Sequence, residues 1–125
     1  MEYIVYTLSI ETAISAAHLL RDYEGPCSRI HGHNWKIRVE VSANELDKHG
    51  IAIDFLDLKK ITWQVVGPFD HNNFNKIPPF DKLNPTAENI VKYFYDEIEK
   101  LLPSDILMKS IRLWETEKYA VEYQK

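Results

Sequence analysis

The strongest constraint on the fold is an alternating run of apolar and polar residues from Asn34 to Ala43. Trp35, Ile37, Val39 and Val41 alternate there with Lys36, Arg38, Glu40 and Ser42. Because successive side chains of a strand point to opposite faces, this run predicts a strand with one buried and one polar face. Just before it stands His31-Gly32-His33. Both histidines share the side of Trp35 if the strand is regular, whereas a bulge at Gly32 would re-aim them.

A third histidine, His18, precedes His31 by thirteen residues, so a neighbouring strand could bring it to the same place. Three imidazoles without an evident fourth protein ligand are typical of a catalytic zinc site, which keeps one position open for water or substrate. The alternative is that these are ordinary surface or core histidines, because His-Gly-His alone is a short and common string. His49, the fourth histidine along the chain, is expected in an exposed turn and receives no role.

The only cysteine, Cys27, stands four residues before His31 in a segment that contains Gly25 and Pro26. A single thiol forms no internal disulfide, so nothing requires an oxidising compartment. Beside a metal site, Cys27 is a candidate nucleophile or base; the alternative is a small buried apolar residue.

The remaining elements follow from periodicity, caps and breakers. We expect strand structure over residues 3–17, with a break or bulge at 11–14, and a loop over 19–30. A first helix should run from the N-cap Asp54 to Val66, where Gly67-Pro68 ends it, and a long loop should follow over 69–83. A second helix should be capped by Thr86 and stopped by Pro103, and two strands should lie within 106–123. The expected apolar stripes are Leu58, Ile61 and Val65; Ile90, Phe94, Ile98 and Leu101; Leu107, Ile111 and Leu113; and Tyr119, Val121 and Tyr123.

The order ββααββ predicts an α+β domain over residues 1–125, an antiparallel sheet with two helices packed on one face. The other face of such a sheet needs cover, and burial against further copies of the chain is the simplest solution, so we expect an oligomer.

Charge and length exclude several classes of function. The formal charge is −4 without a dense basic run, which argues against nucleic acid as the main partner. A cluster of basic residues is enough to attract a phosphorylated small molecule: Arg21, Arg29, Lys36 and Arg38. Each of them taken singly is better explained as part of a solvated strand face. The sequence has no secretory signal pattern and no apolar run of the roughly 20 residues that span a bilayer, so we expect a cytoplasmic protein without a membrane partner.

Six short motifs then appear in one order along nearly the whole chain. They are Ser15-Ala16-Ala17-His18, Cys27-x-x-x-His31-Gly32-His33, Ile53-Asp54-Phe55-x-x-Leu58-Lys59, Phe69-Asp70-His71, Asn84-Pro85-Thr86-x-Glu88-Asn89 and Trp114-Glu115-Thr116. Together they resemble the family of 6-pyruvoyl tetrahydropterin synthase and 6-carboxytetrahydropterin synthase. The resemblance implies a tunnelling fold (T-fold), in which three sheets form a barrel and two trimers stack into a hexamer.

The three residues between Cys27 and His31 resemble the carboxytetrahydropterin synthases of queuosine precursor synthesis. Pyruvoyl-forming enzymes tend to have a longer insertion there, and a folate-linked branch has glutamate in place of the cysteine region. Ile14 departs from the family, where an aromatic residue often precedes Ser-Ala-Ala-His.

The resemblance also implies roles for particular residues. Zinc held by His18, His31 and His33 would act on the side chain of 7,8-dihydroneopterin triphosphate, a small-molecule pterin substrate. Cys27 would be the general base, with Asp70 and His71 as a proton-shuttling pair from a neighbouring subunit. Glu115 would anchor the pterin, and Thr86 would either contact the substrate or serve only as the helix N-cap. The alternative activities are triphosphate elimination to the pyruvoyl product and pterin binding without catalysis.

Overall fold

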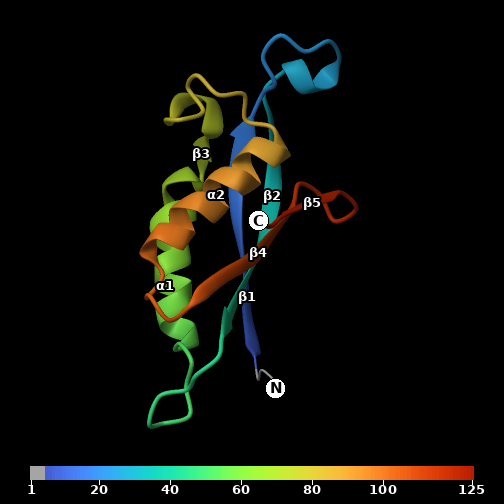
Figure 1. Ribbon diagram of the computed structural model, residues 1–125. Coiled ribbons are helices and arrows are strands. Elements are labelled where there is room, and N and C mark those ends of the chain that lie inside the picture. Colours follow the sequence, from blue (N-terminus) through green and yellow to red (C-terminus); the bar gives the residue numbers. More distant parts are fainter. Residues whose placement is uncertain (1–4) are drawn as a thin grey trace.

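The computed structural model describes residues 5–125 as one mixed sheet with two helices (Figure 1). The elements are β1 (Tyr6–His18), β2 (His31–Ala43), α1 (Phe55–Val66), β3 (Asn72–Asn73), α2 (Ala87–Leu101), β4 (Leu107–Trp114) and β5 (Ala120–Tyr123), with 3-10 turns η1 (Pro26–Ser28), η2 (Gly67–Phe69) and η3 (Phe74–Lys76). The strand order is β3-β1-β2-β4-β5, and all neighbours are antiparallel except β3, which runs parallel to β1. The predicted α+β class and the two helices are confirmed.

The long hairpin of β1 and β2 forms the centre of the sheet. Its register is continuous from Tyr6 opposite Ala43 to His18 opposite His31. The break expected at residues 11–14 is therefore wrong, because every residue there pairs with β2. The question left open at Gly32 is also answered, since Gly32 pairs regularly with Ala17 and causes no bulge.

Both helices pack on the same face of the sheet, and the core lies between the two layers (Figure 1). The odd-numbered residues of β2 from Trp35 to Ala43 are buried there, as the alternation predicts. The helices contribute Leu58 and Val65 from α1 and Ile90, Phe94 and Ile98 from α2. Leu101, expected in the same stripe, is exposed at the end of α2.

The predicted helix boundaries and caps are correct. Asp54 accepts a hydrogen bond from the Leu56 amide, and Thr86 accepts one from the Asn89 amide. Gly67, however, does not end α1 in a left-handed conformation, because its φ is −57° and it continues into η2. A Cβ at Gly67 would lie 2.9 Å from the Trp63 ring, so close packing explains this glycine. Neither helix has the length and apolar character to cross a membrane.

A bulge corrects the expected stripe on β4. The β2–β4 register shifts between Glu40 and Val41, so Met108 pairs with Val41 although Ser110 pairs with Glu40. A shift of one residue moves the following side chains to the other face of the sheet. Leu107 is consequently 62% exposed, whereas Ile111 and Leu113 are buried as expected. Val121 and Tyr123 of β5 pack against the core, whereas Tyr119, just before β5, is exposed.

The sheet face opposite the helices is polar, which removes the expected reason for covering it. Glu11 of β1 forms ion pairs with Lys36 at 3.3 Å and Arg38 at 2.8 Å on β2. Lys36 and Arg38 also lie over the Trp114 ring of β4. A face of paired charges is stable in water, so hydrophobic burial does not by itself demand an oligomer.

Candidate functional site

Three histidines converge where β1 ends and β2 begins. His18 is the last residue of β1, and His31 and His33 are the first and third residues of β2. Cross-strand pairing sets His18 opposite His31, and the two-residue period of the strand places His33 on the same face. One ligand nitrogen from each ring lies within 4.8 Å of the other two, which is close enough for the group to hold a metal ion.

Two of the histidines pack against the buried core, which fixes their orientation. Trp35 is fully buried, and its ring stands edge-on to His18 at 4.9 Å and to His33 at 5.2 Å between centroids. The Trp35 indole N–H donates to the Ala16 carbonyl at 3.1 Å, so the indole is itself held in place. The imidazoles thus pack against a rigid aromatic residue.

Hydrogen bonds determine which nitrogen of two of the rings is free. His18 Nδ1 lies 2.8 Å from the Pro85 carbonyl, and His31 Nδ1 lies 2.7 Å from the Arg29 carbonyl. A carbonyl oxygen only accepts, so both Nδ1 atoms carry the proton and both Nε2 atoms keep a free electron pair. The His18 and His33 Nε2 atoms are buried without a hydrogen-bond partner in the described chain. Buried nitrogens without a partner, in a cluster of three close imidazoles, fit a metal ion.

The environment also favours the neutral form that metal binding requires. Burial lowers the pKa of His18, the Pro85 carbonyl counteracts this, and the proximity of His31 lowers the pKa further. Burial likewise lowers the pKa of His33, against the opposing charge of Glu115. The lowered pKa of both imidazoles therefore favours the neutral form, which is the form available as a ligand.

Glu115 approaches this group from the turn after β4. Its Oε1 lies 3.5 Å from His33 Nε2, and both side chains are largely shielded from solvent. A hollow of about 290 Å³ beside Glu115 is lined by Glu88 at the start of α2 and by residues of the β4–β5 turn. Glu115, predicted as a substrate anchor, is thus next to the histidines and open to a small ligand.

Cys27 is not part of the metal-binding group. It is in η1, on the loop that extends beyond the ends of β1 and β2 (Figure 1), and its side chain is half-buried. The Leu20 amide donates to the Cys27 carbonyl at 2.8 Å, which closes the base of this loop. The thiol is free of disulfides, and the loop setting predicted for it is confirmed.

Asp70 and His71 stand on the far side of β1, between η2 and β3. Asp70 Oδ1 accepts the Ser15 amide at 2.9 Å, and the His71 amide donates to the Ser15 carbonyl at 2.6 Å. These bonds hold His71 at a φ of 59°, and its Nε2 lies 3.8 Å from Asp70 Oδ2. The backbone turn at His71 therefore brings the two side chains together.

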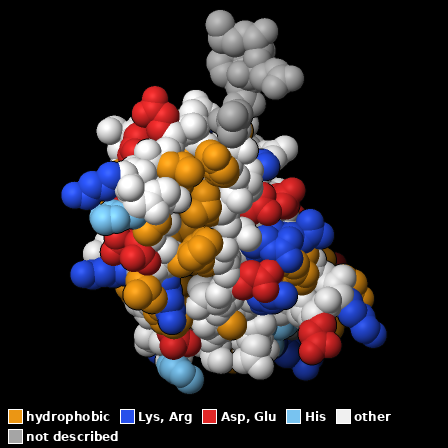
Figure 2. All heavy atoms as spheres, turned by 90° about the horizontal axis from the view of Figure 1, so that it is seen from below, with side chains coloured by type: hydrophobic (Ala, Val, Ile, Leu, Met, Phe, Trp, Pro, Cys, Tyr) orange, Lys and Arg blue, Asp and Glu red, His pale blue; other side chains and the backbone are white. Residues whose placement is uncertain are grey.

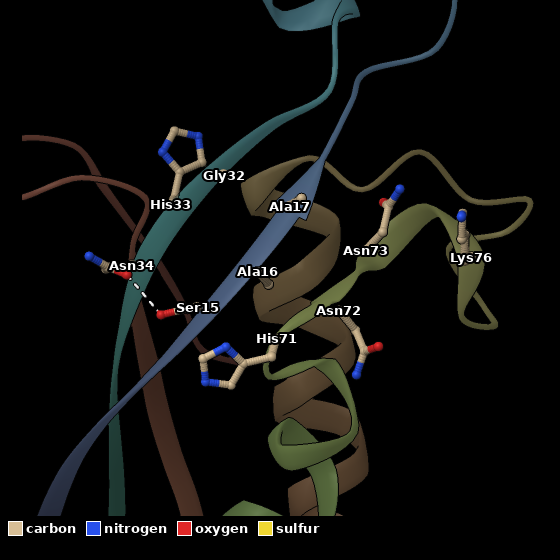
Figure 3. Close-up of a pocket in the computed structure, with 10 residues that line it drawn as sticks. All are labelled: Ser15, Ala16, Ala17, Gly32, His33, Asn34, His71, Asn72, Asn73 and Lys76. Carbon is tan, nitrogen blue, oxygen red and sulfur yellow. Dashed lines mark hydrogen bonds between the residues drawn. The ribbon is translucent and has the colours of Figure 1, made fainter.

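His71 borders an open hollow of about 560 Å³, which Figure 3 shows with its lining side chains. His33 on β2 and His71 before β3 both line it, with β1 between them. Ser15 and Asn34 are joined by a hydrogen bond of 2.8 Å at its floor. Cys27 does not line this hollow, so the chain does not gather the three predicted proton-transfer residues in one cavity.

One feature of the site escaped the sequence. The acceptors for His18 and His31 are the backbone carbonyls of Pro85 and Arg29, and a carbonyl has no sequence signature. Thr86, for which two roles were open, uses its hydroxyl as the N-cap of α2.

Comparison with known proteins identifies the family. The family model described as 6-pyruvoyl tetrahydropterin synthase matches residues 7–125. The chain belongs to this family. It is 37% identical to the dihydroneopterin monophosphate aldolase of Pyrococcus furiosus, over 97% of this chain and 96% of that protein. It is 33% identical to the 6-carboxy-5,6,7,8-tetrahydropterin synthase of Haemophilus influenzae, over 97% and 100% of the two chains.

The solved structure of the 6-pyruvoyl tetrahydropterin synthase from Caenorhabditis elegans superposes with a TM-score of 0.87 at 24% identity, over 100% of this chain and 99% of that one. This match confirms the predicted tunnelling fold at the level of the single chain. Family membership and these relatives together indicate an enzyme of the tetrahydropterin synthase type that acts on a small pterin.

Proposed function

We propose that the protein is a zinc-dependent lyase that converts 7,8-dihydroneopterin triphosphate and one water to 6-carboxy-5,6,7,8-tetrahydropterin, acetaldehyde and triphosphate. The observation that carries the proposal is the convergence of His18, His31 and His33 beside Glu115. Three nitrogen ligands with an open position are the donor set of catalytic zinc. The likeness to the Haemophilus influenzae enzyme supports the product, which suits the synthesis of queuosine precursors.

Each residue then has a task that its geometry supports. A zinc ion bound to the three imidazoles would supply Lewis-acid chemistry, acidifying the substrate side chain that it contacts. Glu115 would accept the 2-amino and N3 hydrogens of the pterin in a bidentate, charge-assisted pair and so hold the side chain near His33. Cys27 would act as the base that removes a proton from the side chain.

His71 would carry that proton onward, because Asp70 holds it at the edge of an open hollow. The strained backbone of His71 is consistent with a functional position, since strain of this kind persists where surrounding bonds enforce it. Thr86 is assigned to the helix cap, and we propose no further contact for it.

We further propose that the enzyme is a homo-oligomer, a hexamer of two stacked trimers. Within residues 5–125, β3 covers the outer edge of β1 only at Ala16 and Ala17, and β5 pairs only with β4. Pairing of the β1 edge with the β5 edge of a neighbour would satisfy both edges and close a ring. The polar sheet face would then line a water-filled channel, and a neighbour's Asp70 and His71 could reach Cys27.

Mass spectrometry of the products from dihydroneopterin triphosphate tests the proposed reaction. The carboxylated pterin together with acetaldehyde is expected, and a chelator should abolish both. A pyruvoyl product would instead identify triphosphate elimination. Bound zinc without turnover of any pterin would indicate a non-catalytic pterin-binding protein.

A second activity is favoured by the 37% identity to the Pyrococcus furiosus aldolase. An aldolase acting on dihydroneopterin monophosphate would break a carbon–carbon bond of the same side chain by retro-aldol cleavage. The same metal site would serve, because both reactions need acidification of a side-chain hydroxyl or its carbon. Incubation with the monophosphate distinguishes the two activities, since only the aldolase releases a phosphorylated two-carbon aldehyde.

A further inference from the structure

The segment that follows His18 has an unusual set of backbone partners. Leu19 to Asp22 belong to no strand, yet two asparagine side chains bind this segment. The Leu19 amide donates to Asn75 Oδ1 at 2.9 Å, and Asn75 Nδ2 donates to the Leu19 carbonyl at 3.0 Å. The Arg21 amide donates to Asn84 Oδ1 at 2.9 Å, and Asn84 Nδ2 donates to the Arg21 carbonyl at 3.4 Å. Each amide thus replaces one residue of a neighbouring strand.

The Arg21 guanidinium ties the same two segments together from the other side. Its Nη2 donates to the Phe80 carbonyl at 2.6 Å and to the Asn75 carbonyl at 3.3 Å, and its Nη1 donates to the Leu83 carbonyl at 3.4 Å. Phe80 is fully buried, which anchors the loop over 75–85 to the core. Arg21 therefore connects the chain after His18 to a loop that cannot shift freely.

This network ends at the metal-binding group. Asn84 precedes Pro85, whose buried carbonyl lies 2.8 Å from His18 Nδ1. Asn89 Nδ2 donates to the Asn84 carbonyl at 2.9 Å, so the first turn of α2 fixes Asn84 as well. The His18 ring and the carbonyl that selects its tautomer therefore sit on two segments that Asn84 joins directly.

We propose that Asn84 is a positioning residue for the metal site, with Asn75 and Arg21 as its partners. It keeps the Pro85 carbonyl against His18 Nδ1, so that His18 Nε2 presents its electron pair to the metal. Loss of such a partner to a metal-bound histidine typically lowers metal affinity about 10–100-fold. The inference rests on the metal site of the proposed function, and it assigns Asn84 no contact with the substrate.

The test is zinc affinity, measured on the full chain by competition with a chromophoric chelator. Asn84→Ala should bind zinc about 10–100-fold more weakly than the wild type while circular dichroism stays unchanged. The visible spectrum of the protein loaded with Co²⁺ alone should also change, because it reports the geometry of the ligands. Asp47→Ala is the matched control, since Asp47 Oδ1 likewise accepts two backbone amides but in the remote loop at His49 and Ile51.

Unchanged zinc affinity and an unchanged Co²⁺ spectrum in Asn84→Ala would overturn the inference. A wild type that binds no zinc would instead overturn the metal site of the proposed function. If Asn84→Ala does not fold, Arg21→Lys keeps the charge but loses the fork between the Phe80 and Leu83 carbonyls. It should then show weaker zinc binding, and affinity equal to the wild type would refute the role of the network.

Discussion

A single chain brings the three metal-binding histidines together, but it does not bring the proposed proton-transfer residues together. His18, His31 and His33 are placed by the continuous register of one hairpin, and their ligand nitrogens meet within 4.8 Å. Cys27 lies on a loop beyond that hairpin, and His71 lies across β1 from His33. Strand pairing therefore completes the first group within the chain, whereas the second depends on loops and, as we propose, on a neighbouring subunit.

The apolar surface at the other end of the hairpin offers a contrast with both groups. Figure 2 views the molecule from this end and shows hydrophobic side chains gathered near its centre. Tyr6, Leu46, Ile51 and Phe55 are exposed here around a hollow of about 400 Å³. The metal-binding histidines thus lie at one end of β1 and β2, and this apolar surface lies at the other end of the same two strands.

The largest expected effect tests the completeness of the metal site. His31→Ala combined with His33→Ala should reduce zinc from about one ion per chain to background, because two of three imidazoles are gone. Metal analysis of protein purified without chelator measures this. His49→Ala, which changes an exposed residue of the remote loop, should keep its zinc. Stoichiometric zinc in the double variant would move the metal site elsewhere.

Removal of the proposed base should reduce turnover without affecting metal binding. Cys27→Ala is expected to keep zinc and fold, since Cys27 lies outside the histidine group. Its turnover should fall about 10²–10⁴-fold, the usual contribution of a positioned base. Steady-state rates and metal content, measured on the same preparation, check both parts. A rate near that of the wild type would assign the base to His71 or to metal-bound hydroxide.

Mixed oligomers test whether the proton relay is shared between chains. Cys27→Ala and His71→Ala should each be inactive alone, but random co-assembly should restore about one quarter of wild-type activity, because some interfaces join the intact half of each chain. Co-expression with two affinity tags isolates the mixed species. Absence of recovery in proven mixtures would place the whole relay within one chain. A monomeric mass in solution would refute the assembly itself.

The smallest effect concerns Thr86, which lies beside the site without a proposed catalytic task. Thr86→Ala removes the side-chain acceptor of the Asn89 amide and should cost about 1 kcal/mol of unfolding free energy. KM for the pterin should stay unchanged. Chemical denaturation measures the first quantity and initial rates the second. Thr86→Ser should restore stability, and a raised KM in Thr86→Ala with normal stability would show that the hydroxyl contacts substrate.

Periodicity and caps predicted much of the fold because they reflect local physics. The alternation after Asn34 fixed which side of β2 is buried, and Asp54 and Thr86 marked the helix starts correctly. The wrong predictions concern features that depend on how one strand pairs with another. The stripe that included Leu107 failed at a bulge that only the β2–β4 register reveals, and the break expected within β1 is absent because β2 pairs along its full length.

The sequence by itself determined the ligand types at this site and the buried face of β2 from Trp35 onward, because a strand repeats every two residues. The sequence motifs also indicated the family, which the comparison with the family model confirms. Tertiary structure alone decided that His18 stands opposite His31 and that the Pro85 carbonyl selects its tautomer. It likewise showed that Cys27 does not line the hollow that His71 borders. These relations join residues far apart in sequence, and backbone carbonyls and strand registers leave no residue pattern from which to infer them.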